Sequence, residues 1–168
     1  MDAESVINAL GLKPLPEEGG YFRETYRSNG RIRAGVLSAT AESRSFFSAI
    51  YYLITPDTFS ALHRLAYDEI FHFYLGDPVR QVHLAPDGEL REVILGTNLL
   101  EGQVPQTRVQ AYRWQGAKLL PGGKWALLGT TMAPGFEWND FELGPRSRLI
   151  QQFPAHEAVI KEFTRGES

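Results

Sequence analysis

Short apolar segments separated by turn residues fill the middle of the chain. These segments are rich in Val, Ile, Phe, Tyr and Thr, the residue types that favour β-strands. Strands joined by tight turns in such numbers predict an all-β barrel or sandwich. We expect them at residues 21–27, 46–54, 58–63, 68–75, 79–84, 90–95, 107–114, 117–120 and 125–132, with short ones near 32–37 and 141–143.

The two ends of the chain have the apolar spacing of helices. Residues 3–10 precede Gly11, a residue typical of a helix end, and residues 154–164 repeat the helical spacing near the C-terminus. At 168 residues the chain is long enough for one full hydrophobic core. We therefore predict one domain over 1–168, made of a helical cap and linker (1–20), a barrel (21–143) and a C-terminal helical segment (144–168).

Two of the predicted strands, residues 46–54 and 68–75, are apolar at nearly every position. One face of such a strand can line a barrel interior, but the other face also needs cover from a second sheet or a partner subunit. This pattern predicts a homodimer.

The candidate chemistry lies in residues 58–75. If these residues form an antiparallel hairpin, His63 lies directly opposite Glu69, on the same face as Phe71 and Phe73. His72 falls on the other face, where a structural role is expected. The pairing predicts a histidine and a carboxylate that together face a pocket.

Composition narrows the function classes. Net charge is −3 and the cations are scattered, which argues against nucleic acid as a partner. No apolar run is long enough to cross a membrane, and the acidic N-terminus does not resemble a signal peptide, so we expect a cytoplasmic protein. The chain has no cysteine, so a metal would need His, Asp or Glu as ligands.

Several segments resemble a known family. Glu69 and Gly76 have the spacing of the first motif of the cupin superfamily, in which two histidines and a glutamate on a hairpin bind a metal. The chain is similar over most of its length to an uncharacterised family of stand-alone, single-domain cupins. The matching segments are residues 18–28, 49–53, 68–78, 105–106, 114–117 and 133–141. The resemblance implies a double-stranded β-helix (jelly-roll) barrel, usually dimeric, and no settled reaction.

The chain departs from the metal-binding cupin pattern at two places. The first motif's histidine pair is incomplete, because Ala61 or Leu65 occupies the partner position of His63. No histidine follows Pro134-Gly135, where the second motif would supply one. A weaker divalent-metal site on His63 and Glu69, with Asp140 as a further ligand, stays open.

Three functions are therefore compared. The first is a metal-independent isomerase or epimerase of a sugar-like substrate, which needs no cofactor. His63 would be its base, Glu69 or Asp140 would hold that base, and Tyr51 would be the acid. The second is a binding module for a small, carbohydrate-like ligand without turnover. The third is a metal-dependent enzyme using His63 and Glu69.

The remaining candidates are predicted to line the ligand pocket. Aromatic residues at such positions have core packing as their alternative role. For Asp140 the alternative is an ordinary turn residue. The candidates are Phe71, Phe73, His83, Phe136 and Asp140.

Overall fold

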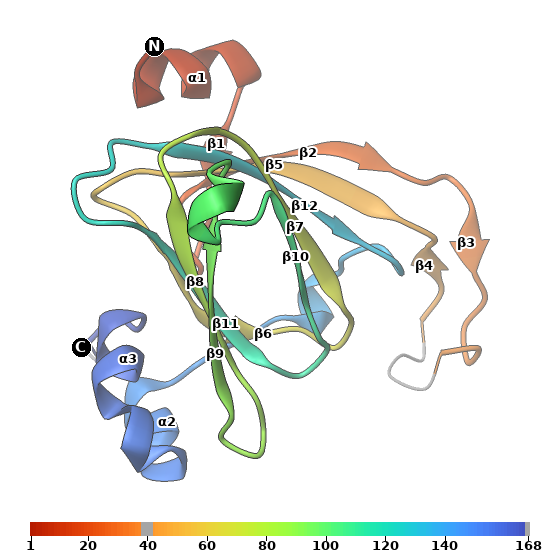
Figure 1. Ribbon diagram of the computed structural model, residues 1–168. Coiled ribbons are helices and arrows are strands. Elements are labelled where there is room, and N and C mark those ends of the chain that lie inside the picture. Colours follow the sequence, from red (N-terminus) through yellow and green to blue (C-terminus); the bar gives the residue numbers. More distant parts are fainter. Residues whose placement is uncertain (38–41, 167–168) are drawn as a thin grey trace.

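Two antiparallel sheets face each other in the computed structural model, which describes residues 1–37 and 42–166 (Figure 1). The six-stranded sheet has the order β1 (Lys13–Pro14), β2 (Tyr21–Arg27), β5 (Ser48–Ile54), β12 (Ala126–Met132), β7 (Glu69–Gly76) and β10 (Gln106–Val109). The five-stranded sheet has the order β13 (Glu142–Leu143), β6 (Ser60–Arg64), β11 (Trp114–Leu119), β8 (Val79–Leu84) and β9 (Leu90–Leu95). A small pair, β3 (Arg31–Ile32) and β4 (Arg44–Ser45), lies beside the barrel.

Alternation along the strands builds the interior. In β7, Glu69, Phe71 and Phe73 are buried, whereas Ile70 and His72 are only partly covered. A cluster of apolar side chains from both sheets fills one part of the space between them. It includes Tyr52, Ile54, Phe71, Phe73, Val79, Leu95, Ala117 and Leu128. The predicted all-β, jelly-roll-like barrel is confirmed.

Helices cover the outer faces of the two sheets. The predicted N-terminal helix is confirmed as α1 (Ala3–Leu10), which packs through Val6 on Leu53 and Leu127. At the other end, α2 (Arg146–Gln152), η3 (Pro154–His156) and α3 (Glu157–Glu162) pack on the five-stranded sheet. The prediction of one helix over 154–164 missed α2, and the α-helix there begins only after a turn of 3₁₀-helix that contains Pro154. Two further 3₁₀ turns are η1 (Leu99–Glu101) and η2 (Trp138–Asp140).

The predicted hairpin of residues 58–75 is wrong. β6 pairs with β11 and β13, whereas β7 pairs with β12 and β10, so the two strands belong to opposite sheets. Both edges of each strand are already hydrogen-bonded to other neighbours, and none is left for the other member of the expected hairpin. Residues 65–68 therefore carry the chain from one sheet to the other. His63 and Glu69 still face each other, but across the barrel interior.

A β-bulge in β6 determines which side chains point inward. Ser60 pairs with Ala117 and His63 pairs with Gln115, so three steps along β6 match two steps along β11. Without the extra residue, Ser60 and His63 would lie on opposite faces of the strand. The bulge puts both on the inner face.

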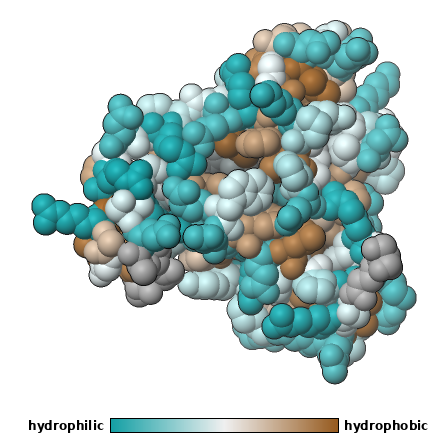
Figure 2. Space-filling view, turned by 180° about the vertical axis from the view of Figure 1, so that it is seen from behind, coloured by the Kyte–Doolittle hydropathy of each residue, from teal (hydrophilic) through white to brown (hydrophobic). Residues whose placement is uncertain are grey.

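In the described ranges, no helix is long and apolar enough to cross a membrane. The surface seen in Figure 2 mixes hydrophilic residues with small hydrophobic patches. On the outer side of β7, Tyr74 and Leu75 are about half exposed. The homodimer stays a prediction.

Candidate functional site

A cavity of about 150 Å³ lies between the sheets, beside the packed cluster. Its walls come from strands of both sheets and from two loops, one before β2 and one after β12. Its polar lining is Glu18, Glu24, Arg27, Ser48, His63, Glu69, Thr130 and Glu137, and its aromatic lining is Phe22, Phe136, Trp138 and Phe141.

His63 is fixed in one orientation on the cavity wall. The side chain is 2 % exposed, and its ring stacks on Phe141 with centroids 5.2 Å apart. Nδ1 lies 2.8 Å from the carbonyl oxygen of Ala61. A carbonyl oxygen only accepts, so Nδ1 must carry a proton and donate it. Nε2 is therefore the nitrogen that can gain or lose a proton.

The nearest acid to this nitrogen is Glu18, whose Oε2 is 3.9 Å from His63 Nε2. The other carboxylate oxygen of Glu18 accepts a 2.7 Å hydrogen bond from the hydroxyl of Ser60. Tyr52 supports the same loop, because its hydroxyl donates to the carbonyl oxygen of Gly19 at 2.9 Å. Burial, with the neighbouring Glu18 carboxylate, raises the pKa of Tyr52 well above its usual value. Tyr52 therefore acts as a neutral donor.

Glu69 forms the opposite wall and is 7 % exposed. Gln115 on β11 donates to its Oε2 at 2.8 Å across the interior. Burial raises the pKa of Glu69, and the nearby charge of His63 and hydrogen bonds from Thr130 and Gln115 oppose that rise. The cavity thus has a histidine between two carboxyl groups, one of which holds its proton more tightly than an exposed glutamate.

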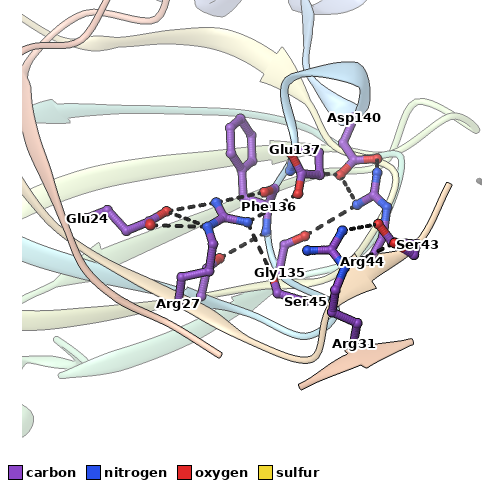
Figure 3. A network of polar contacts seen from close by, with 11 residues as sticks. Glu24, Arg27, Arg31, Ser43, Arg44, Ser45, Gly135, Phe136, Glu137 and Asp140 are labelled. Atoms are coloured by element: carbon purple, nitrogen blue, oxygen red, sulfur yellow. Dashed lines mark hydrogen bonds and ion pairs between the residues drawn. The ribbon is translucent and has the colours of Figure 1, made fainter. Parts of the chain in front are cut away.

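The loop after β12 forms the roof of the cavity. Trp138 contacts Phe136 and Phe141 edge to face, with centroids 5.3 and 5.6 Å apart. Arg27 holds one side of this loop by donating to Glu137 and to the carbonyl oxygen of Phe136 (Figure 3). The same guanidinium also pairs with Glu24 at 2.7 Å.

A buried ion pair holds the other side of the roof. Arg44 donates to both carboxylate oxygens of Asp140, at 2.5 and 2.6 Å, and each side chain is 3 % exposed (Figure 3). Asp140 also accepts from the backbone N–H of Glu137. The structure thus places the Asp140 carboxylate against Arg44, outside the lining of this cavity, rather than beside His63.

The predicted acid, Tyr51, is on the wrong face of β5. Its ring lies under the guanidinium of Arg23 and edge-on to Tyr74, on the outside of the sheet. Strand alternation turns its neighbour Tyr52 inward instead. A shift of one residue in the assumed facing of the strand accounts for the error.

The predicted lining residues fall in three places. Phe136 lines the cavity. Phe71 and Phe73 face inward as expected but belong to the packed cluster rather than to the cavity wall. His83 is buried at a different pocket, on the far side of β11 from His63.

Most of the cavity lining was absent from the predicted set, and so were three polar residues at or beside His63 and Glu69: Glu18, Ser60 and Gln115. Glu18 and Gln115 occur within segments 18–28 and 114–117, which carry the family resemblance, so a signal was present. Ser60 had none, because only the bulge in β6 turns it inward.

The metal option depends on the available donors. In the part of the chain that the structure describes, no three His, Asp or Glu side chains form a group that could hold a metal ion. Asp140, the further ligand considered from the sequence, is occupied by Arg44. The residues present do not fit the metal-binding cupin pattern, and the chemistry below uses only groups of the chain itself.

Comparison with known proteins agrees with this architecture. The family described as "Cupin superfamily (DUF985)" matches residues 4–144. The chain belongs to the cupin superfamily. The resemblance stated from the sequence segments is confirmed.

Two solved structures of related proteins align with nearly the whole length of this cupin. Protein SO0799 from Shewanella oneidensis is 32 % identical with a TM-score of 0.88, and the match covers 99 % of each chain. A hypothetical protein from Leishmania major is 30 % identical with a TM-score of 0.90, covering 99 % of this chain and 100 % of that one. The uncharacterised protein YML079W of Saccharomyces cerevisiae is 28 % identical over 132 residues, which are 73 % of this cupin and 66 % of the yeast protein.

More distant structures share the fold alone. An oxalate decarboxylase is 12 % identical with a TM-score of 0.55, and a dTDP sugar isomerase from Desulfovibrio desulfuricans is 18 % identical with a TM-score of 0.52.

Proposed function

We propose that this cupin is a proton-transfer enzyme of the isomerase or epimerase type, acting on a small hydroxylated carbonyl compound. One observation carries the proposal. His63 directs a single exchangeable nitrogen, Nε2, toward a cavity whose walls supply two carboxyl groups, Glu18 and Glu69.

The chemistry assigns one role to each of these groups. Nε2 of His63 takes a proton from the carbon next to the substrate carbonyl, and the C–H electron pair becomes the C=C bond of an enol. Glu69, whose pKa is raised by burial, delivers a proton to the carbonyl oxygen. Delivery of the proton from Nε2 to the former carbonyl carbon, with the proton of the neighbouring hydroxyl passing to Glu69, moves the carbonyl by one carbon and completes an isomerisation. An epimerisation requires instead that the enol turns its other face to Nε2 before the proton returns to the original carbon and the enol proton returns to Glu69. Glu18 stabilises the imidazolium that forms between the two steps.

Cavity size and lining limit the substrate. A cavity of this volume holds about one benzene-sized molecule. The aromatic roof offers flat apolar faces, and Arg27, Glu24 and Glu137 give polar contacts at the side. A hydroxyketone or keto-sugar with about six non-hydrogen atoms, which means about three carbons, matches this combination.

Solvent deuterium exchange tests the proposal. The protein is incubated in D₂O with a panel of small hydroxyketones and keto-sugars, and exchange at the carbon next to the carbonyl is followed by NMR. We expect exchange with the native protein and its loss in His63→Gln. Tyr51→Phe, altered on the outer face of the sheet, is the matched control and should retain the native rate.

The folding of His63→Gln is checked by urea unfolding, so that lost exchange is not confused with lost structure. Saturable binding of a panel compound without exchange, measured by calorimetry, would indicate a ligand-binding module rather than an enzyme. Equal exchange rates in His63→Gln and the native protein would refute the role given to His63.

A further inference from the structure

A second pocket of about 310 Å³ opens in the barrel wall at β8, β9 and β10. Its lining is polar and carries three arginines and one glutamate, together with His83. The arginines are Arg91, Arg108 and Arg113, and the glutamate is Glu89. It contains none of the residues that form the cavity around His63, so it is a separate site.

His83 lies at the buried floor of this pocket. It is 2 % exposed, and its Nε2 has no hydrogen-bond partner among the residues that the structure describes. In the sheet register it lies between Gln115 on β11 and Arg91 on β9. A buried nitrogen without a partner costs free energy unless something hydrogen-bonds to it.

The arginines around His83 are held in place to different degrees. Arg113 is fixed by Gln110 at 3.1 Å and by Glu89 at 3.0 Å. Arg108 lies 3.5 Å from Asp68, and both side chains are about half exposed. Arg91 forms no ion pair within the described ranges. The pocket therefore has an excess of positive charge, with at least one guanidinium free to take an anion.

We propose that this pocket binds a phosphate group, either as free inorganic phosphate or as the monoester of a small molecule. Arg91 and Arg113 supply paired N–H donors that match the geometry of phosphate oxygens. His83, once protonated, supplies a third donor from the base of the pocket. Among the described residues no Phe, Tyr or Trp lines the pocket, so its charged donors are the groups that would recognise a ligand.

The electrostatics of His83 support this assignment. Burial, together with the charges of Arg91 and Arg113, lowers the pKa of His83 to about 4. A bound dianion would reverse the effect of the two arginines and stabilise the imidazolium. Phosphate binding should therefore raise the pKa of His83. The negative charge of Glu89, the acid of this pocket, is offset by its ion pair with Arg113.

The test is a titration of the full-length protein with inorganic phosphate, followed by NMR of the histidine side chains and by calorimetry. A parallel titration with glycerol phosphate distinguishes a monoester from free phosphate, and sodium chloride at equal ionic strength controls for screening. We expect saturable binding, with the pKa of His83 rising and the signals of His63 unchanged.

Variants locate the site. Arg91→Gln, at an exposed position on β9, should weaken phosphate binding about tenfold or more, the usual effect of losing a charge-assisted contact. Arg148→Gln, which removes the same charge from the exposed face of α2, should bind as the native protein does. No saturable binding by the native protein, or equal weakening in the two variants, would overturn the proposal.

Discussion

Asp140→Asn should be strongly destabilising because it leaves the charge of Arg44 buried without a counter-ion. The native pair has two short hydrogen bonds, at 2.5 and 2.6 Å, and both side chains are 3 % exposed. Nε of Arg44 already lacks a partner among the described residues. Losing one partner of such a pair costs about 3–5 kcal/mol. We expect a loss in the free energy of unfolding within this range.

A surface pair provides the matched control. Glu142 accepts from Arg64 at 2.6 Å, but the two side chains are 41 % and 32 % exposed, so solvent screens their attraction. Glu142→Gln should therefore change the free energy of unfolding by less than about 1 kcal/mol. The N–O distances are similarly short in the two pairs, so the comparison mainly reports the effect of burial.

Urea unfolding of the native protein and the variants measures the effect. A lower midpoint with an unchanged m-value indicates lost stability rather than a changed denatured state. The double variant Arg44→Met with Asp140→Leu should recover most of the loss, because it removes both charges instead of one. If Asp140→Asn lies within about 1 kcal/mol of the native protein, or matches Glu142→Gln, the assignment of a buried, structural ion pair is refuted.

Three further predictions concern buried polar groups. Because the folded-state pKa of His83 lies below the unfolded value of 6.5, native stability should rise by about 3 kcal/mol at most between pH 4 and 6.5. His83→Gln should lack this rise in urea unfolding followed in phosphate-free buffer, and an identical pH profile would contradict it. The raised pKa of Glu69 has the opposite effect on stability, because the folded protein binds this proton more tightly than the unfolded chain does. Native stability should therefore fall as pH increases above 4.5, and Glu69→Gln should flatten that decline. Tyr52→Phe should lower the free energy of unfolding by about 1 kcal/mol through the lost bond to Gly19, while Tyr51→Phe should change it by less than about 0.5 kcal/mol; equal effects would refute the assigned facing of β5.

Local sequence signals predicted most of the strands. The turn Pro86-Asp87-Gly88 sets the hairpin of β8 and β9, whose bounds match the predicted residues 79–84 and 90–95. Alternation within β7 also placed Glu69, Phe71 and Phe73 on one face correctly. Both are properties of neighbouring residues, which the sequence contains directly.

Strand pairing depended on residues far away in the chain. Nothing in residues 65–68 distinguishes a hairpin turn from a crossing between sheets, and the partners of β6 and β7 come from other segments. His63 and Glu69 nevertheless share a cavity because both face the interior of the barrel. The prediction of which tyrosine faces the interior, Tyr51 or Tyr52, failed for a related reason. β5 is apolar on both faces, so its sequence gives no inside–outside pattern.

The loop residues of the site were the hardest to predict. Glu18 reaches His63 from a linker 45 positions earlier in the chain. Asp140 sits close to the roof aromatics in sequence, yet its partner Arg44 is 96 positions away. Such contacts follow from the closed barrel and not from local spacing.

The central claim is that His63 presents Nε2, and only Nε2, to the cavity as a proton carrier. Side-chain ¹⁵N NMR of His63 across a pH titration tests it without knowledge of the substrate. The structure predicts that Nδ1 keeps its proton throughout, because the carbonyl oxygen of Ala61 accepts it, while Nε2 alone gains and loses one. A neutral form of His63 with the proton on Nε2 and none on Nδ1 would contradict the claim.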